Sequence, residues 1–302
     1  MHRLVGILCL ALLLSCAPER GGETRRAAER PDARGRVDRA TTARATTAAG
    51  EGDWADDTAT RLTNVDTKFK ELLEVWIDET DSQPYGAKFR DLELLGLKKQ
   101  KLMRRLVKFP RLSKDVLPML PTRLRLEAHR NIKAGRDLYR LTQPIKGKVR
   151  MKTSKPKGPK RLLRYYDEAE RRFDVPWTIL ASINLIESKM GRLNGPSSAG
   201  ALGPMQFMPA TWDAYGRGSP FNTHNAIMAA ARYLAANGAP QRMRDALWNY
   251  NHSDLYVNAV LAYHRHMKTY PKSYYGYYFW QVFVRTAGGD KQLTGPGSNY
   301  RY

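Results

Sequence analysis

The feature that most constrains the fold is the segment PWTILASINLIES at residues 176–188, which stays apolar for nearly three helical turns. Pro176 lies in its first turn, and proline is favoured at the start of a helix. A helix with so few polar positions has to be buried inside a domain. The segment nevertheless ends with a carboxylate, Glu187. We therefore predict a buried helix that brings a single acid to its C-terminal end.

A glycine-rich loop follows this helix and contains Gly191, Gly195, Gly200 and Gly203. Glycines allow the backbone to come close to a ligand. The next segment, GPMQFMPATW, surrounds a single amide, Gln206, with large apolar side chains, namely Met205, Phe207, Met208 and Trp212. This arrangement predicts a cleft beside Glu187, although it does not by itself define a reaction.

Composition divides the rest of the chain. Residues 17–60 are rich in Arg, Ala, Thr and Gly and have almost no large apolar side chains, so we predict a disordered tether. Residues 61–142 show apolar residues at three- and four-residue intervals and predict a small, basic helical module. Residues 143–160 combine Pro, Gly and Lys without periodicity and predict a linker. Residues 161–268 predict a mostly α domain without a strand of convincing length.

The C-terminal extension, residues 269–302, is unusually aromatic, with seven aromatic residues between positions 270 and 280. Aromatic faces can stack on sugar rings, so one interpretation is a flap that contacts a glycan. The alternative is a segment that packs on the preceding domain with its tyrosines partly exposed. The sequence leaves both open.

The N-terminus predicts export to the cell envelope. Residues 1–16 combine a basic start, about eleven apolar residues and the exit LLSC, a pattern typical of a secretory signal and too short for a transmembrane helix. The exit resembles a bacterial lipobox, in which Cys16 is lipidated and becomes the N-terminus of a membrane-anchored, periplasmic lipoprotein. The alternative is an ordinary signal cleaved near Ala17. The two cysteines, Cys9 and Cys16, both lie in the signal, so we expect no disulfide in the exported domain.

The formal net charge of +22 is unevenly distributed. Residues 98–160 hold 21 Lys and Arg against 3 Asp and Glu, whereas residues 161–268 hold 12 against 8. Such a positive region attracts polyanions, which in the envelope are anionic polymers or lipid headgroups. Export and the lack of interleaved aromatic side chains argue against nucleic acid as a partner.

Residues 178–263 resemble the lytic transglycosylase branch of the lysozyme superfamily. The resemblance rests on four ordered parts: Glu187 and Ser188 at a helix end, the segment SSAGALGPMQFMPATW, the alanine-rich AIMAAARYL and the tripeptide NYN. It implies a lysozyme-like, α-rich catalytic domain. It also implies cleavage of the β-1,4 bond between N-acetylmuramic acid and N-acetylglucosamine in peptidoglycan.

The resemblance also assigns roles to individual residues. Glu187 matches the catalytic acid. The residues that match substrate-contacting or cleft-lining positions, or are expected beside them, are Ser188, Ser197, Met205, Gln206, Phe207, Tyr250 and Asn251. Pro204 departs from the leucine found in many relatives. Burial of Glu187 against Met205, Phe207 and Tyr250 would raise the pKa of the carboxyl group, as a general acid requires.

A single acid is sufficient for this chemistry. Most glycosidases use two carboxylates, but a transglycosylase replaces the attacking water with the C6 hydroxyl of the same sugar, which gains from proximity. The product then has a 1,6-anhydro end. For a hydrolase on the same fold, the candidate second acids are Asp213 and Asp254, which the sequence places in helix starts where structural roles are expected.

The third alternative is an inactive peptidoglycan-binding lipoprotein. No cofactor is expected, and the histidines show no metal-binding pattern with supporting acids; they are His224, His252, His264 and His266. His264 and His266 lie two residues apart on a predicted helix and are expected to face different ways.

Overall fold

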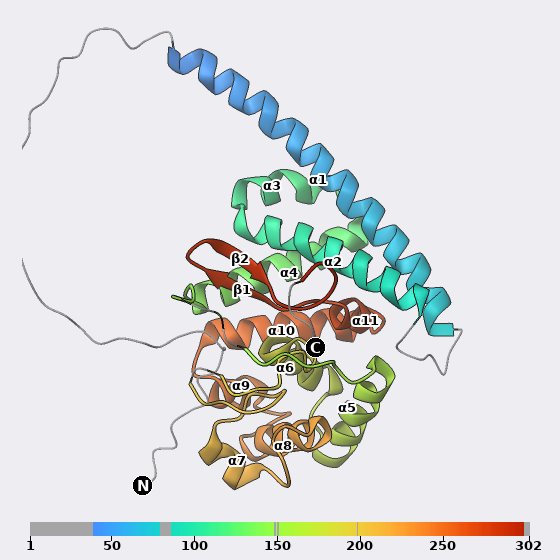
Figure 1. Cartoon of the computed structure of the whole chain (residues 1–302), viewed down its shortest axis with the longest axis vertical. Coiled ribbons are helices and arrows are strands. Elements are labelled where there is room, and N and C mark those ends of the chain that lie inside the picture. Colours follow the sequence, from blue (N-terminus) through green and yellow to red (C-terminus); the bar gives the residue numbers. More distant parts are fainter. Residues whose placement is uncertain (1–38, 79–85, 148, 150, 198, 299–302) are drawn as a thin grey trace, which may run out of the picture.

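The computed structural model describes residues 39–78, 86–147, 149, 151–197 and 199–298, and only the backbone for residues 39–53 (Figure 1). The predicted signal at 1–16, with Cys16, and residues 17–38 of the predicted tether lie outside this range. None of the helices in the described part has the length and apolar character needed to cross a membrane.

The described part of the chain is mostly α, as predicted, with eleven helices and one antiparallel hairpin. The helices are α1 (Arg39–Asp78), α2 (Ala87–Lys108), α3 (Pro110–Met119), α4 (Thr122–Leu141), α5 (Pro159–Phe173), α6 (Trp177–Ser188), α7 (Pro209–Tyr215), α8 (Thr223–Ala236), α9 (Met243–Tyr250), α10 (Asp254–Thr269) and α11 (Ser273–Tyr278). The hairpin pairs β1 (Phe283–Thr286) with β2 (Gly289–Gln292).

In the structure α1 begins at Arg39, within the segment of residues 17–60 that the sequence predicted as a tether. Ala55, Thr58 and Ala59 are buried, and the two alanines join a core cluster with residues of α2, α3 and α4. The prediction looked for large apolar side chains. Here small ones make the contacts, and alanine is also the best helix former.

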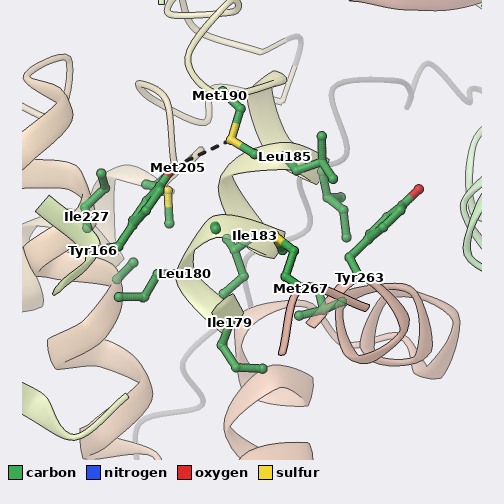
Figure 2. Packing of buried hydrophobic residues seen from close by; sticks show 14 of the residues in the cluster. Tyr166, Ile179, Leu180, Ile183, Leu185, Met190, Met205, Ile227, Tyr263 and Met267 are labelled. Atoms are coloured by element: carbon green, nitrogen blue, oxygen red, sulfur yellow. Dashed lines mark hydrogen bonds between the residues drawn. The ribbon is translucent and has the colours of Figure 1, made fainter. Parts of the chain in front are cut away.

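Helix α6 lies at the centre of the fold, and all of its residues after Trp177 are buried. It begins directly after Pro176. Figure 2 shows its apolar side chains between two groups of neighbours: Tyr166, Met205 and Ile227 on one side, and Tyr263 and Met267 on the other. The prediction of a buried helix is therefore confirmed.

Helix α10 lies between α6 and α4 and packs on both (Figure 1). The main hydrophobic cluster includes Phe69, Leu73 and Trp76 of α1, Leu92 of α2 and Ala134 of α4, together with most of the apolar core around α6. The basic helices therefore contribute to the core of the domain that follows them, in addition to the second cluster that they form among themselves.

The described residues between 143 and 158 form no helix or strand, and α5 begins at Pro159. Several of these residues nevertheless contact the rest of the protein. Ile145 forms a parallel bridge with Thr286, and Thr153 an antiparallel bridge with Leu193. Ile145, Val149 and Met151 pack against a small cluster under the hairpin. The predicted linker is thus docked on the protein surface.

The aromatic C-terminal segment contributes to the core. Tyr274, Tyr277, Tyr278 and Phe279 are all buried. Tyr277 donates a hydrogen bond to Asn131 Oδ1 of α4 at 2.8 Å, and Gln281 exchanges two hydrogen bonds with the side chain of Gln100 of α2, at 2.8 and 2.9 Å. Of the two interpretations of this segment, the structure supports packing on the protein over a glycan-contacting flap.

A buried cation links three of the basic helices. Lys99 Nζ lies 2.6 Å from Asp66 Oδ1 of α1 and 2.6 Å from Glu127 Oε1 of α4, and all three side chains are buried. The sequence predicted that the module would be basic on its outside. Lys99 is an exception, held inside because two carboxylates compensate its desolvation.

Lys99→Ala should destabilise the protein by about 3–5 kcal/mol, because two buried carboxylates lose their shared cation. Urea unfolding at pH 7 measures the change. Lys101→Ala, on the exposed face of the same helix, is the matched control and should stay within about 0.5 kcal/mol of wild type. Equal stabilities for the two variants would contradict a structural role for the buried ion cluster.

Candidate active site

Glu187 occupies the last turn of α6 and is only 3% exposed. The helix ends immediately afterwards because Lys189 and Met190 adopt left-handed backbone conformations, with φ of 53° and 61°. The Glu187 Oε1 atom accepts a hydrogen bond of 2.6 Å from the Tyr256 hydroxyl. Within the described residues, the second carboxyl oxygen, Oε2, has no hydrogen-bond partner although it is buried. Tyr256 therefore satisfies Oε1, whereas Oε2 is left without a hydrogen-bond donor or acceptor among the described residues.

The sequence analysis missed Tyr256, which comes from the first turn of α10. Its ring stacks on Tyr250, with centroids 6.3 Å apart and ring planes 5° from parallel. Tyr250 in turn donates a hydrogen bond of 2.7 Å to the Met205 carbonyl and contacts the edge of Phe207. The structure therefore brings Glu187, Tyr250, Met205 and Phe207 together, with Tyr256 as the link.

Side chains of α6 hold the glycine-rich loop in place through hydrogen bonds. Ser188 Oγ donates to the Pro204 carbonyl at 2.6 Å and accepts from the Gly191 amide at 2.9 Å. Asn184 also donates to the Pro204 carbonyl, at 2.9 Å. Gly203 has a φ of 70°, and a side chain there would collide with the Pro220 carbonyl. Ser188 therefore positions the loop, and its burial does not support the predicted contact with substrate.

The other predicted contact residues also lie inside the loop or the core. Ser197 Oγ accepts hydrogen bonds from the Ala199 and Ala201 amides, which shapes a turn. Gln206 is 2% exposed and donates to the Gly203 carbonyl at 2.8 Å. Among the described residues, Gln206 Oε1 and Asn251 Oδ1 are buried acceptors without a partner. Buried acceptors without a partner are rare in folded proteins and are often found at functional sites.

Burial raises the pKa of the Glu187 carboxyl to about 8, against the opposing effects of the Tyr256 hydrogen bond and the Lys189 charge. The side chain is therefore largely protonated at neutral pH, as a general acid must be. Burial and the nearby Arg104 lower the pKa of Lys189 to about 8, with Glu187 opposing the shift. The Lys189 ammonium donates to the Leu185 carbonyl at 2.9 Å, so it remains directed toward the end of α6.

Glu187 lines a cavity of about 180 Å³, which we call the Glu187 cavity. Its walls come from α2, α4, the end of α6, α10 and the hairpin. The lining includes the aromatic residues Tyr139, Tyr263, Trp280 and Phe283, the cations Arg104, Lys108, Lys189 and Arg285, and one further carboxylate, Asp290. Met205, Gln206, Phe207, Tyr250 and Asn251 do not line it and are buried in the core.

The candidate second acids of a hydrolase and the four histidines lie outside the Glu187 cavity. Asp213 and Asp254 are exposed, and neither lines the Glu187 cavity. His264 contacts Thr178 of α6 and His266 contacts Arg130 of α4, so the two face different helices as predicted. In the part of the chain that the structure describes, no three His, Cys, Asp or Glu side chains cluster as metal ligands would.

Residues 164–272 match the family model of the transglycosylase SLT domain. This match confirms, for this part of the chain, the resemblance to the lysozyme-like catalytic domain of lytic transglycosylases that the sequence analysis found. The match covers about a third of the 302 residues and excludes α1 to α4 and the hairpin. Searches of curated proteins and of solved structures returned no match. At this level the domain supports a peptidoglycan-acting, glycan-cleaving enzyme of the cell envelope.

The raised pKa of Glu187 predicts a pH-dependent gain in stability for Glu187→Gln. Between the ordinary carboxyl pKa of 4.5 and the folded value of about 8, the folded state holds a proton that the unfolded state has released. The stability of wild type therefore falls with rising pH, by up to about 1.4 kcal/mol per pH unit from this group. Glutamine carries no such penalty, so the advantage of the variant should grow from pH 5 to 8 and then level off.

Urea unfolding of both proteins at several pH values measures this difference. Glu71→Gln, at an exposed position of α1, is the matched control and should show no such trend. A stability difference for Glu187→Gln that stays constant from pH 5 to 8 would show that the carboxyl titrates normally.

Proposed function

We propose that this protein is a peptidoglycan lytic transglycosylase that cleaves the MurNAc-β-1,4-GlcNAc bond without water and leaves 1,6-anhydroMurNAc ends. The observation that supports the proposal is the state of Glu187: a buried carboxyl group whose pKa is raised to about 8 and whose Oε2 has no hydrogen-bond partner among the described residues, in a residue that lines a cavity and lies within the match to the transglycosylase SLT domain.

Glu187 acts first as an acid. The Tyr256 hydroxyl donates to Oε1, so the proton resides on Oε2, the oxygen without a protein partner. Oε2 gives this proton to the glycosidic oxygen as the bond from that oxygen to C1 of the muramic acid breaks. The leaving sugar departs as a neutral alcohol. The charge that develops at C1 is supported by the N-acetyl group of the same sugar.

Glu187 then acts as a base. The C6 hydroxyl of the muramic acid attacks C1, and the Glu187 carboxylate removes its proton. The enzyme returns to its starting protonation state, and the product differs from a hydrolysed end by one water. Because the nucleophile belongs to the same ring, no second carboxylate is required to activate a water molecule.

The two alternatives from the sequence remain distinct from this proposal. A hydrolase requires a second acid, and the further carboxylate on the Glu187 cavity is Asp290, which pairs with Arg104 at 2.8 Å. An inactive binding protein has no need for a buried acid held by a tyrosine. We place the enzyme in the periplasm as a lipoprotein anchored through Cys16.

We also propose that residues 98–160 bind anionic polymers of the envelope. A test by deletion of these residues is unsuitable, because they include Ala134 of the main core and Met103 and Leu106 of the second cluster. Substitution of exposed cations tests the idea without removing a helix.

Glu187→Gln should reduce glycan cleavage at least about 100-fold, because glutamine cannot donate and recover a proton. Digestion of sacculi followed by mass spectrometry measures both the rate and the product, and wild type should release 1,6-anhydro ends. Glu71→Gln should retain wild-type activity. Reducing ends in place of anhydro ends would identify a hydrolase, and near-normal cleavage by Glu187→Gln would remove Glu187 from the mechanism.

The pH dependence provides a separate test of Tyr256. The rate should fall above a pH of about 8 as Glu187 loses its proton. The hydrogen bond from Tyr256 lowers the pKa of Glu187, so Tyr256→Phe should move this basic limb upward by about one pH unit. The pH profile of kcat/KM measures the shift. Tyr263→Phe, a tyrosine that lines the cavity without bonding Glu187, serves for comparison, and equal profiles for both variants would contradict the assignment.

A further inference from the structure

Much of the wall of the Glu187 cavity comes from parts of the chain outside the transglycosylase SLT domain match. Arg104 and Lys108 belong to α2, and Arg285 and Asp290 to the hairpin. In Figure 1 the hairpin lies beside α2 and α4, and Arg104 bridges the two parts through its ion pair with Asp290. These residues belong to this chain's own additions to the catalytic domain, so they can add selectivity to a shared reaction.

The charges on this wall are strongly unbalanced. Four cations, Arg104, Lys108, Lys189 and Arg285, line the same cavity as two carboxyl groups, Glu187 and Asp290. Asp290 compensates Arg104, and the mechanism requires Glu187 to be uncharged when substrate binds. A concave, half-enclosed surface with excess positive charge attracts an anionic group of the ligand.

The cations are also held in place. The Arg285 guanidinium lies 3.9 Å from the centroid of the Tyr139 ring, and its Nη1 donates to the Thr142 carbonyl at 3.2 Å. The Arg104 guanidinium lies 4.6 Å from the centroid of the Phe283 ring. Stacking on aromatic rings fixes the planes of the two guanidinium groups, which favours recognition of a carboxylate over non-specific attraction.

A further cation of this wall, Lys108, is the last residue of α2, and its side chain is exposed. Among the described residues, no ion pair or hydrogen bond involves its ammonium group. It is therefore available to a ligand at the mouth of the cavity, whereas Arg285 lies between Tyr139 of α4 and the hairpin. Together they provide one exposed cation and one cation that is held against an aromatic ring.

We infer that the cations of this wall form a subsite for a carboxylate of the glycan substrate, next to the bond that Glu187 cleaves. The inference rests on the proposed function. In peptidoglycan the carboxylate has two sources: the lactyl group of muramic acid when no peptide is attached, or the stem peptide when one is present. In both cases the carboxylate is borne by the muramic acid, the sugar whose C1 bond breaks.

The experiment compares three glycan substrates: strands with intact stem peptides, strands whose stem-peptide carboxylates have been converted to amides, and peptide-free strands with free lactyl carboxylates. Wild type should cleave intact strands about fivefold to tenfold more efficiently, in kcat/KM, than amidated strands, and the advantage should shrink at high salt. If peptide-free strands share the advantage, the lactyl group also occupies the subsite. If they do not, the stem peptide is the source.

Lys108→Ala and Arg285→Gln should each lower kcat/KM for intact strands more than for amidated strands, and so reduce the preference between them. Arg285→Lys should restore part of the preference because it keeps the charge. Lys101→Ala on α2 and Arg125→Gln on α4 are exposed matched controls outside the cavity and should keep the full preference. Thermal melting identifies any variant that fails to fold. If Arg285→Gln fails to fold, Lys108→Ala, at an exposed helix end, provides the readout.

Equal cleavage of all three kinds of strand by wild type would overturn the subsite while leaving the proposed function intact. Variants that lose activity equally on all three substrates would overturn it as well. If wild type cleaves none of the strands, the proposed function fails first and the inference fails with it.

Discussion

The whole site depends on the burial of one carboxyl group at the end of a helix that is itself buried. Helix α6 is packed on every side, so Glu187 has little water to stabilise its charge, and its pKa rises to about 8. Tyr256 satisfies one oxygen only. The energetic cost of keeping an acid in this place is borne by the apolar contacts along the rest of α6. Catalytic competence and core stability therefore oppose each other at a single residue.

The helices before the catalytic domain have two roles. Through Phe69, Leu73, Trp76 and Leu92 they complete a core that the catalytic domain shares. Through Arg104, Lys108 and Tyr139 they form a wall of the cavity in which Glu187 lies. A family domain that covers about a third of the chain thus gains its local environment from segments outside it.

Periodicity and apolar content were enough to predict α6, its acid and the amphipathic helices on either side, because those elements are defined by their own residues. Other features depend on contacts between distant positions. The N-terminal half of α1 is fixed by Ala55 and Ala59, which leave no strong hydrophobic pattern. The short helix α3 and the four-residue strands of the hairpin are too brief to show a period. Tyr256 is one of 16 tyrosines, and only the fold places it against position 187. The predicted contacts of Ser188 and Gln206 followed from family resemblance, and the structure shows both residues buried.

The paired hydrogen bonds between Gln100 and Gln281 join positions 181 residues apart. A ribosome delivers position 100 long before position 281, so α2 has to wait for almost the entire chain before its partner exists. Trp280, Phe283 and Arg285, which line the catalytic cavity, arrive equally late. A nascent or truncated chain accordingly lacks one side of its own cavity. The order of synthesis thereby delays completion of the Glu187 cavity until the hairpin has been made.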